Sequence, residues 1–329
     1  VNRIAKFKNI PTLNLYHGVL TCTDTSPGAS KNMNLLGRSK FIFTRIPRMF
    51  FKVIPTYFYS LRTTKAKKKV YLKVLQDLYK MALGIRTVSP ASDTNCTYKA
   101  VYTESDKMHA IKKYNSSDQN TFVVGNPDLF NFGFKKEDFM SLSKKNSGEN
   151  NHIIYIDSGM PLSGRVFASY KEYIDHIELT KIKLEDQNYK LLLKLKPNTM
   201  NSTLVDLMLK RNFEIIEDNK SVTQIIKKAS AVITEDSTFA LVPGLIGIPL
   251  FLANYGKLKD ILYGEALTSY PRSRKLKNLS NINQKISVLW QNSNYENLMS
   301  WGYKNSGPLP SDDMPYRVAE ILEKMVKKL

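Results

Sequence analysis

The chain has 329 residues, of which 42% are hydrophobic, and this is enough to bury the cores of two ordinary domains. Its two cysteines, Cys22 and Cys96, lie far apart, which excludes a disulfide framework and a cysteine metal cluster and favours a reduced, cytoplasmic setting. The formal net charge of +20 indicates an acidic partner, such as nucleic acid, anionic lipid or a phosphorylated substrate.

The N-terminal part begins with a short apolar strand over residues 10–19, which ends at the His17-Gly18 turn. A basic and aromatic segment follows over residues 31–80, which contains 13 Lys or Arg residues and a single acid, Asp77. Between the cations lie Phe41, Phe43, Met49, Phe50, Phe51, Tyr57, Phe58 and Tyr59.

This basic aromatic segment contains no run of about 20 apolar residues that would span a bilayer. We expect it to lie on an anionic membrane surface, with the aromatic rings in the interface and the cations against lipid headgroups. The alternative is a core-packing segment with a solvated basic face. Nucleic acid is a further possible partner, but the sequence has no recognisable RRM, OB or helix-turn-helix pattern, and we expect no nucleic acid.

Alternating strands and helices are predicted from residue 98 onward. We expect a strand over 98–105, a helix over 106–114 capped near Ser105, and a strand from 120 into the Gly125-Asn126-Pro127 turn. Residues 144–151 are polar and are predicted to form a linker. Residues 1–145 therefore read as the back half of a Rossmann-like domain, and we expect part of this domain to precede Val1.

After the linker, strand and helix patterns alternate with short connections up to residue 253. The predicted strands are apolar runs with their polar ends, over 152–159, 190–197, 213–218, 230–236 and 248–253, and a long apolar helix is expected from near Ser237. Such runs are typical of a parallel sheet covered on both faces. We therefore predict a doubly wound domain over 152–305, followed by a C-terminal helix within 306–329.

Polar turns follow several of these strands. They are His17-Gly18, Gly125-Asn126-Pro127, Asp157-Ser158-Gly159, Lys196-Pro197 and Glu235-Asp236-Ser237-Thr238. A single such turn is more often a helix cap than a ligand site. In a parallel sheet, however, the carboxyl ends of the strands meet at one edge, where ligands bind.

The residue types in these turns favour an anionic nucleotide ligand. Ser237 and Thr238 open a predicted helix, where backbone N–H groups favour phosphate, and the Ser158-Gly159 turn lets a diphosphate approach the backbone. Lys196 would neutralise a departing nucleotide. Glu235 and Asp236 are predicted to hydrogen-bond the hydroxyl groups of the donor sugar, or simply to cap the helix. Ile216 and Glu217 are predicted to contact the edge of the nucleoside.

His17 is the candidate general base, because a neutral imidazole can take a proton from an acceptor hydroxyl near pH 7. Its structural alternative is a hydrogen-bonded histidine with no catalytic role. Asp24 is a second candidate base. His152 and His176 are predicted to be structural, and no metal site is expected.

The order of these motifs resembles the GT-B glycosyltransferase superfamily. More narrowly, the chain is similar to CDP-glycerol glycerophosphotransferases and to bacterial polysialyltransferases and Kdo transferases. The resemblance rests on "LYHG" at Leu15, "VVGNPDLF" at Val123, "IIYIDSG" at Ile153 and "EDSTFALVPGLIGIP" at Glu235. "KLKP" matches the family's His-Pro only partly, because Lys196 stands where the family has His.

The resemblance implies two Rossmann-like domains that face a cleft, with the donor on 152–305 and the acceptor on 1–145. It implies that Ser237 and Thr238 bind the donor phosphate or sugar carboxylate, and that His17 is the base of an inverting displacement. Lys196 can offset leaving-group charge, but it is a poor proton donor at an ordinary pKa of about 10.4. This substitution leaves the leaving-group chemistry open.

We therefore predict a metal-independent, inverting glycosyltransferase on the inner face of the cell membrane. It would move a sugar from a nucleotide-activated donor, for which CMP- and CDP-linked sugars are candidates, and would need no further cofactor. The acceptor would be a lipid-linked or polymeric glycan of a bacterial capsule or lipopolysaccharide. Polyol-phosphate transfer from a CDP-linked donor, a non-hydrolysing sugar-nucleotide epimerase and a non-catalytic lipid- or nucleic-acid-binding module are the alternatives.

Overall fold

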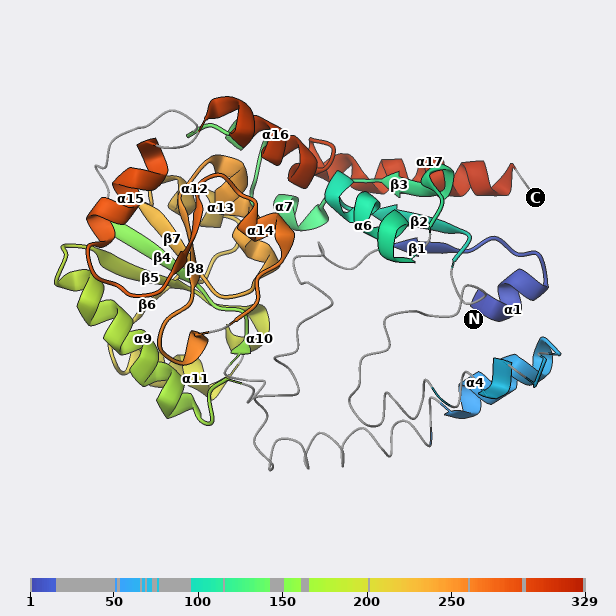
Figure 1. Cartoon of the computed structure of the whole chain (residues 1–329), viewed down its shortest axis with the longest axis horizontal. Coiled ribbons are helices and arrows are strands. Elements are labelled where there is room, and N and C mark those ends of the chain that lie inside the picture. The colour runs from blue at the N-terminus through green and yellow to red at the C-terminus, as the bar shows by residue number, and fades with distance from the viewer. Residues whose placement is uncertain are drawn as a thin grey trace.

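The computed structural model describes two parallel sheets with helices packed around them, which we call the three-stranded lobe and the six-stranded lobe (Figure 1). The described residues are 2–15, 51, 54–65, 67–68, 70–72, 76, 96–114, 116–142, 151–160, 166–200, 202–259, 261–291 and 294–327. Among them, no helix has both the length and the apolar character that crossing a bilayer requires.

The six-stranded sheet has the order β6-β5-β4-β7-β8-β9, and every neighbouring pair is parallel. Its strands are β4 (His152–Ile156), β5 (Lys190–Lys194), β6 (Glu214–Ile215), β7 (Ala231–Thr234), β8 (Leu250–Ala253) and β9 (Ser273–Leu276). The chain extends the sheet on one side of β4 and then returns to the other side with β7. The carboxyl ends of β4 and β7 therefore form the switch point at which open α/β sheets bind ligands.

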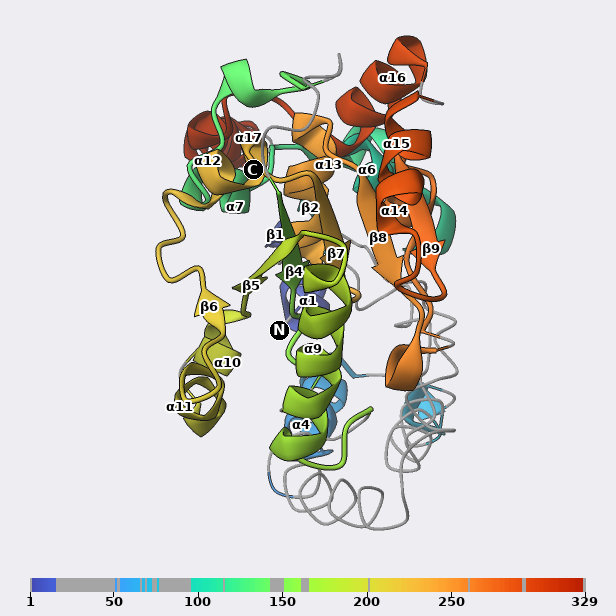
Figure 2. The same ribbon diagram turned by 90° about the vertical axis from the view of Figure 1, so that its left-hand side faces the viewer.

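Alternating side chains of these strands point to two separate cores, as expected for a sheet covered on both faces. Ile153 and Tyr155 face the core formed with α9 (Tyr170–Glu185), α11 (Thr203–Leu209) and α15 (Ile282–Gln291). Ile154 and Ile156 face the core formed with α12 (Val222–Lys227), α13 (Leu241–Ile246), α14 (Glu265–Thr268) and α16 (Tyr295–Ser306). Figure 2 shows α9 lying across its face of the sheet.

The three-stranded lobe is a parallel sheet of order β1-β2-β3. Its elements are β1 (Leu13–Leu15), β2 (Tyr98–Val101), β3 (Thr121–Val123), α1 (Asn2–Phe7), α4 (Ile54–Thr63), α6 (Glu104–Tyr114) and α7 (Pro127–Asn131). The helix α17 (Met314–Val326) lies beside this sheet, whereas α16 packs on the six-stranded lobe (Figure 1). Buried residues of both lobes and of α17 form one continuous core.

Local details differ from the sequence prediction in several places. Helix α6 begins at Glu104, because Thr103 and Asp106 exchange hydrogen bonds at its start and so replace Ser105 as the cap. The expected long apolar helix after β7 is a 3₁₀ turn followed by the six-residue α13, which ends where Gly247 adopts a φ of 102°. The elements α1, α4, α7, α14 and β9 were not predicted.

The predicted linker lies almost wholly outside the described residues, which end at 142 and resume at 151. The domain boundaries at 145, 152 and 305 stay predictions.

Candidate functional site

Two buried carboxylates organise the loops at the switch point. Asp157 follows β4 directly and Glu235 follows β7 directly, and the two side chains are 2% and 0% exposed. Because β4 and β7 are paired in register, both carboxylates lie at the same edge of the sheet. Buried charges of this kind require partners that compensate for lost hydration.

Glu235 joins the β7 loop to the β4 loop. Its Oε2 accepts hydrogen bonds from the backbone N–H of Ser158 at 3.0 Å and from the Ser158 hydroxyl at 2.7 Å. Its Oε1 accepts from the Tyr155 hydroxyl at 2.9 Å. The carboxylate therefore positions Ser158 and does not face solvent, which corrects the prediction that Glu235 contacts sugar hydroxyls or caps a helix.

Asp157 joins the β4 loop to the β5 loop. Its Oδ1 accepts from Gly159 N–H at 2.8 Å and from the Tyr173 hydroxyl at 3.2 Å. Its Oδ2 accepts from the Thr199 hydroxyl at 2.7 Å and from Lys196 N–H at 3.2 Å. Together, the two carboxylates hold the loops after β4, β5 and β7 in one arrangement.

The proximity of the two acids changes the proton affinity of Glu235. Burial, followed by the negative charge of Asp157, raises the pKa of the Glu235 carboxyl, while the hydrogen bonds from Ser158 and Tyr155 lower it. The same burial, with the charge of Glu235, raises the pKa of Tyr155 and keeps this phenol protonated as a donor.

Some of the predicted donor-binding residues are brought together, and their roles differ. Ser158 and Gly159 direct their donors to Glu235 and Asp157, so in this conformation their turn is a support and not a phosphate cradle. Gly159 has a φ of 80°, and a Cβ placed there would lie 3.0 Å from Cδ of Lys196. The aliphatic part of Lys196 thus packs against the glycine turn.

The groups that remain available for a ligand are on Lys196, Ser237 and Thr238. Lys196 and Thr238 are exposed and Ser237 is half-buried. Within the described part of the chain, the Lys196 ammonium and both hydroxyls form no hydrogen bond or ion pair, and Ser237 caps its 3₁₀ turn without a side-chain bond. One cation and two hydroxyls at a sheet edge can bind a phosphate oxygen.

The other predicted site residues differ in their exposure. Asp236 is half-buried between Glu235 and Ser237. At the end of the edge strand β6, Glu217 is exposed, whereas the Ile216 side chain is buried in the core and its N–H donates to the Leu193 carbonyl at 2.8 Å. Because its side chain and N–H are occupied, Ile216 can offer only its backbone carbonyl to a nucleoside.

Three further predictions concern the histidines and the second acid. The candidate bases His17 and Asp24 lie outside the described residues. His176 stacks on the Tyr255 ring with centroids 5.2 Å apart, and burial lowers its pKa to about 4. His152 is half-buried, with its ring 3.5 Å from the Ile225 carbonyl oxygen. Both positions fit structural histidines.

The Gly125-Asn126-Pro127 turn belongs to the junction between the lobes. A Cβ on Gly125 would lie 3.1 Å from the Pro308 carbonyl oxygen, and Asn126 caps α7 through Asp128 N–H. Arg317 of α17 donates to the Val124 carbonyl at 3.0 Å. This turn therefore packs against the segment between α16 and α17 and is not an open ligand loop.

Sequence reasoning missed the supporting residues of the site. Asp157, Thr199 and Tyr155 were not selected, although Asp157 stands in a turn that was. A tyrosine inside an apolar strand, at Tyr155, was the available signal, because a buried phenol usually has a hydrogen-bond partner. Among the described residues, no group of three or more His, Cys, Asp or Glu side chains is arranged to hold a metal ion.

Comparison with known proteins defines the fold. No protein-family model and no curated protein matches the chain. Among solved structures, the calicheamicin glycosyltransferase CalG4 is similar over 99% of this chain and 72% of its own, at 12% identity and a TM-score of 0.50.

Two further solved structures match a smaller share of the chain. The wall teichoic acid polymerase TagF matches 72% of this chain and 60% of its own, at 14% identity and a TM-score of 0.45. The UDP-GlcNAc 2-epimerase of Methanocaldococcus jannaschii, in complex with UDP-GlcNAc and UDP, matches 70% and 61%, at 13% identity and a TM-score of 0.43. This chain spans less than two thirds of the length of either protein.

The CalG4 likeness and the two parallel sheets confirm the predicted architecture. The chain therefore has a two-sheet α/β fold of the GT-B type.

Proposed function

We propose that the chain is an inverting glycosyltransferase that takes its sugar from a nucleotide-activated donor. The observation that carries this proposal is the Asp157–Glu235 network, which holds three loops together at the switch point of a GT-B sheet. Preorganised loops of this kind allow binding energy to act on the reacting groups without a cost for ordering them. Lys196, Ser237 and Thr238 then bind the donor phosphates.

The chemistry that we propose is a direct displacement. The acceptor hydroxyl attacks the anomeric carbon, a base takes its proton, and the nucleotide leaves with the electrons of the glycosidic C–O bond. His17 is the proposed base, with Asp24 as the second candidate. Lys196 stabilises the negative charge of the departing nucleotide without donating a proton. No step in this scheme requires a metal ion.

A nucleotide panel tests the donor site. Thermal unfolding with CMP, CDP, UDP and GDP should reveal one base that stabilises the protein, because a ligand at ~100 Kd adds about 2.7 kcal/mol. Lys196→Ala and the double variant Ser237→Ala/Thr238→Ala should lose the shift. Lys190→Ala is the matched control, because Lys190 lies at the opposite end of β5 and pairs with Glu214.

Product analysis with the stabilising nucleotide then separates the reaction classes. Sugar transfer supports the proposal, and transfer of a polyol phosphate from a CDP-linked donor replaces it. Interconversion of two free sugar nucleotides identifies an epimerase. If no nucleotide of the panel stabilises the protein, the result contradicts the proposal. If the protein then binds vesicles or oligonucleotides, the result supports a non-catalytic module.

The acceptor is the less constrained half of the proposal. We propose a lipid-linked or polymeric glycan at the cytoplasmic face of the cell membrane, as in capsule or lipopolysaccharide assembly. Support comes from the described part of the basic aromatic segment, where Phe51 and Tyr59 are 82% and 67% exposed and the cations Arg62 and Lys65 are exposed as well. Exposed aromatic rings next to cations are suited to a lipid interface.

Sedimentation with vesicles tests this location. The protein should bind vesicles that contain phosphatidylglycerol and should not bind phosphatidylcholine alone, since each basic residue near an anionic surface contributes about 1 kcal/mol. Phe51→Ser with Tyr59→Ser should weaken the binding, whereas Tyr316→Ser on α17, which is also exposed, should not. Equal binding by all variants would contradict the role of this segment.

A further inference from the structure

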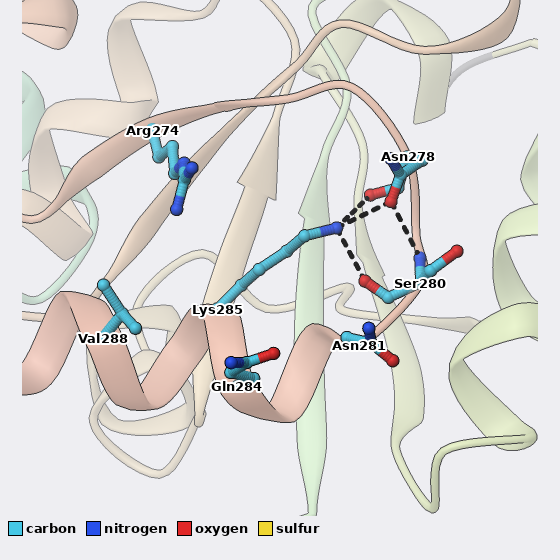
Figure 3. A pocket seen from close by; sticks show the side chains of 7 residues that line it. All are labelled: Arg274, Asn278, Ser280, Asn281, Gln284, Lys285 and Val288. Atoms are coloured by element: carbon cyan, nitrogen blue, oxygen red, sulfur yellow. Dashed lines mark hydrogen bonds between the residues drawn. The ribbon is translucent and has the colours of Figure 1, made fainter.

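A second candidate binding site lies between the edge strand β9 and helix α15, away from the switch point. The structure contains there a cavity of about 410 Å³, which is within the size range of small-ligand sites. Its lining residues are Arg274, Asn278, Ser280, Asn281, Gln284, Lys285 and Val288 (Figure 3). Two strands, β7 and β8, separate β9 from the Asp157–Ser158 loop.

The cavity is lined by positively charged residues, and the part of the sequence that forms it contains no acidic residue. Between Glu265 and Glu296 the chain has five cations and no Asp or Glu. In the described residues, neither Arg274 nor Lys285 forms an ion pair with a carboxylate. Burial, and then the charge of Arg274, lower the pKa of Lys285. Two cations that repel each other across a cavity favour an anion between them.

Lys285 uses its donors to shape the cavity. Its ammonium donates to the Asn278 carbonyl at 2.9 Å, to Oδ1 of Asn278 at 2.7 Å and to the Ser280 carbonyl at 2.6 Å. Figure 3 shows this side chain reaching from α15 to the loop that precedes the helix. Lys285 thus fixes the wall and contributes its charge, while the direct contacts are left to other residues.

The remaining polar groups of the wall are free to contact a ligand. Arg274 is exposed, and among the described residues its guanidinium has no hydrogen-bond partner; the same holds for the side chains of Asn281 and Gln284 and for the Ser280 hydroxyl. A guanidinium matches a carboxylate or phosphate with two parallel hydrogen bonds. Amides and a hydroxyl, which both donate and accept, match the hydroxyl groups of a sugar.

Strand geometry places Arg274 on the cavity side. Leu276, two residues further along β9, packs in the same core as Ile282 and Ile286 of α15. Residues two apart in a strand point to the same face, so Arg274 faces α15 as well. Lys275 points to the opposite face. This alternation provides a matched pair of adjacent cations, of which one lines the cavity.

We propose that this cavity binds one acidic saccharide unit, a sugar phosphate or a sugar carboxylate, with the anion on Arg274 and the hydroxyl groups on the Asn281 and Gln284 amides. The proposal does not depend on the transferase activity.

Calorimetric titration tests the site with four probes: glucose 1-phosphate, glucuronate, glucose and inorganic phosphate. At least one of the two acidic sugars should bind saturably, and more tightly than glucose or inorganic phosphate. Arg274→Ala should weaken this binding at least ~10-fold, while Lys275→Ala should leave it unchanged. Gln284→Ala should weaken the binding of the acidic sugar without changing the binding of inorganic phosphate.

Three results would overturn the proposal. They are the lack of saturable binding by either acidic sugar, equal affinity of the Arg274→Ala and Lys275→Ala variants, and binding of inorganic phosphate as tight as that of the sugar acid. The Ser237→Ala/Thr238→Ala variant keeps the experiment separate from the donor site, since binding in the β9–α15 cavity should persist in it. Loss of binding in that variant would assign the ligand to the switch point and would also overturn the proposal. Unfolding curves of each variant verify that it is folded.

Discussion

Ser158 donates both its backbone N–H and its hydroxyl to a single oxygen of Glu235, at 3.0 and 2.7 Å. This contact joins the loops that follow two strands, β4 and β7, which are neighbours in the sheet but far apart in the sequence. It also consumes both donors of a serine that the motif pattern assigned to phosphate binding. The loops at the switch point are therefore held together by acids whose oxygens accept hydrogen bonds from the protein itself.

Removing the Ser158 hydroxyl tests how much this contact stabilises the fold. Ser158→Ala leaves the buried Oε2 of Glu235 with one donor fewer, which should lower the free energy of unfolding by about 1–3 kcal/mol. Urea unfolding at pH 7 measures the effect. Ser221→Ala is the control, because the Ser221 hydroxyl contacts only Asp218 at the surface, at 3.4 Å from its carbonyl oxygen and through its exposed carboxylate, and it should change stability by less than ~0.5 kcal/mol.

Glu235 should make the folded state less stable as the pH rises. Its pKa is raised in the folded protein from 4.5 to about 7, so between these values the folded state binds more protons than the unfolded state. By linkage, the stability contribution of Glu235 is present below pH 4.5 and is lost as the pH rises to about 7, by roughly 3 kcal/mol. Unfolding free energies of the wild type and of Glu235→Gln, measured from pH 5 to 8, should show this slope in the wild type alone. Parallel curves would contradict the assignment.

Asp157 should control that pH dependence. Asp157→Asn removes the charge that helps to raise the pKa of Glu235, so the loss of stability with rising pH should end at lower pH and be smaller. The amide also places an N–H₂ group among four donors, those of Gly159, Tyr173, Lys196 and Thr199. We expect an overall destabilisation of about 2–4 kcal/mol. A variant with an unchanged pH profile would show that the two acids do not interact.

His176 should act in the opposite sense at lower pH. Burial lowers its pKa from 6.5 to about 4 in the folded protein, so the unfolded state binds more protons between these values. Its stability contribution is present above pH 6.5 and is lost as the pH falls to about 4. His176→Phe keeps the ring between Phe167 and Tyr255 and should reduce this acid sensitivity, as measured by unfolding between pH 4 and 7. An equal slope in both proteins would contradict the prediction.

The regular parts of the fold could be predicted because their signals are local. Continuous apolar runs such as Ile153–Ile156 and Ala231–Ile233 identify buried parallel strands, and the alternation with helices implies a doubly wound sheet. The loops that meet at the switch point follow from the same pattern. By contrast, β9 presents the polar residues Arg274 and Lys275, so its sequence has no apolar run to indicate a strand.

The roles within the site could not be predicted from residue type. Ser158 and Glu235 are plausible ligand contacts in sequence, and only the distances between loops show that they bond to each other. The same limit applies to Ser105, whose hydroxyl contacts Asn305 at 2.9 Å from the far end of the chain. A side chain that is satisfied by a distant partner and one that is available for a ligand look alike in a linear pattern.

Arg317 is expected to stabilise the junction between the lobes. Its guanidinium donates to the carbonyl oxygens of Val124, Pro308 and Pro310 at 3.0, 3.3 and 2.9 Å, so it bridges the end of β3 and the segment before α17. Arg317→Ala should lower the free energy of unfolding by about 2–3 kcal/mol, because several charge-assisted hydrogen bonds are lost together. Urea unfolding provides the measurement.

Two further variants isolate the geometric part of this effect. Arg317→Lys keeps the charge but has no planar fork, so it should recover only part of the lost stability. Lys324→Ala on the exposed side of α17 should be close to neutral. If Arg317→Lys were as stable as the wild type, charge alone would explain the effect. If Arg317→Ala were neutral, the continuous apolar core shared by both lobes and α17 would be sufficient to hold the junction.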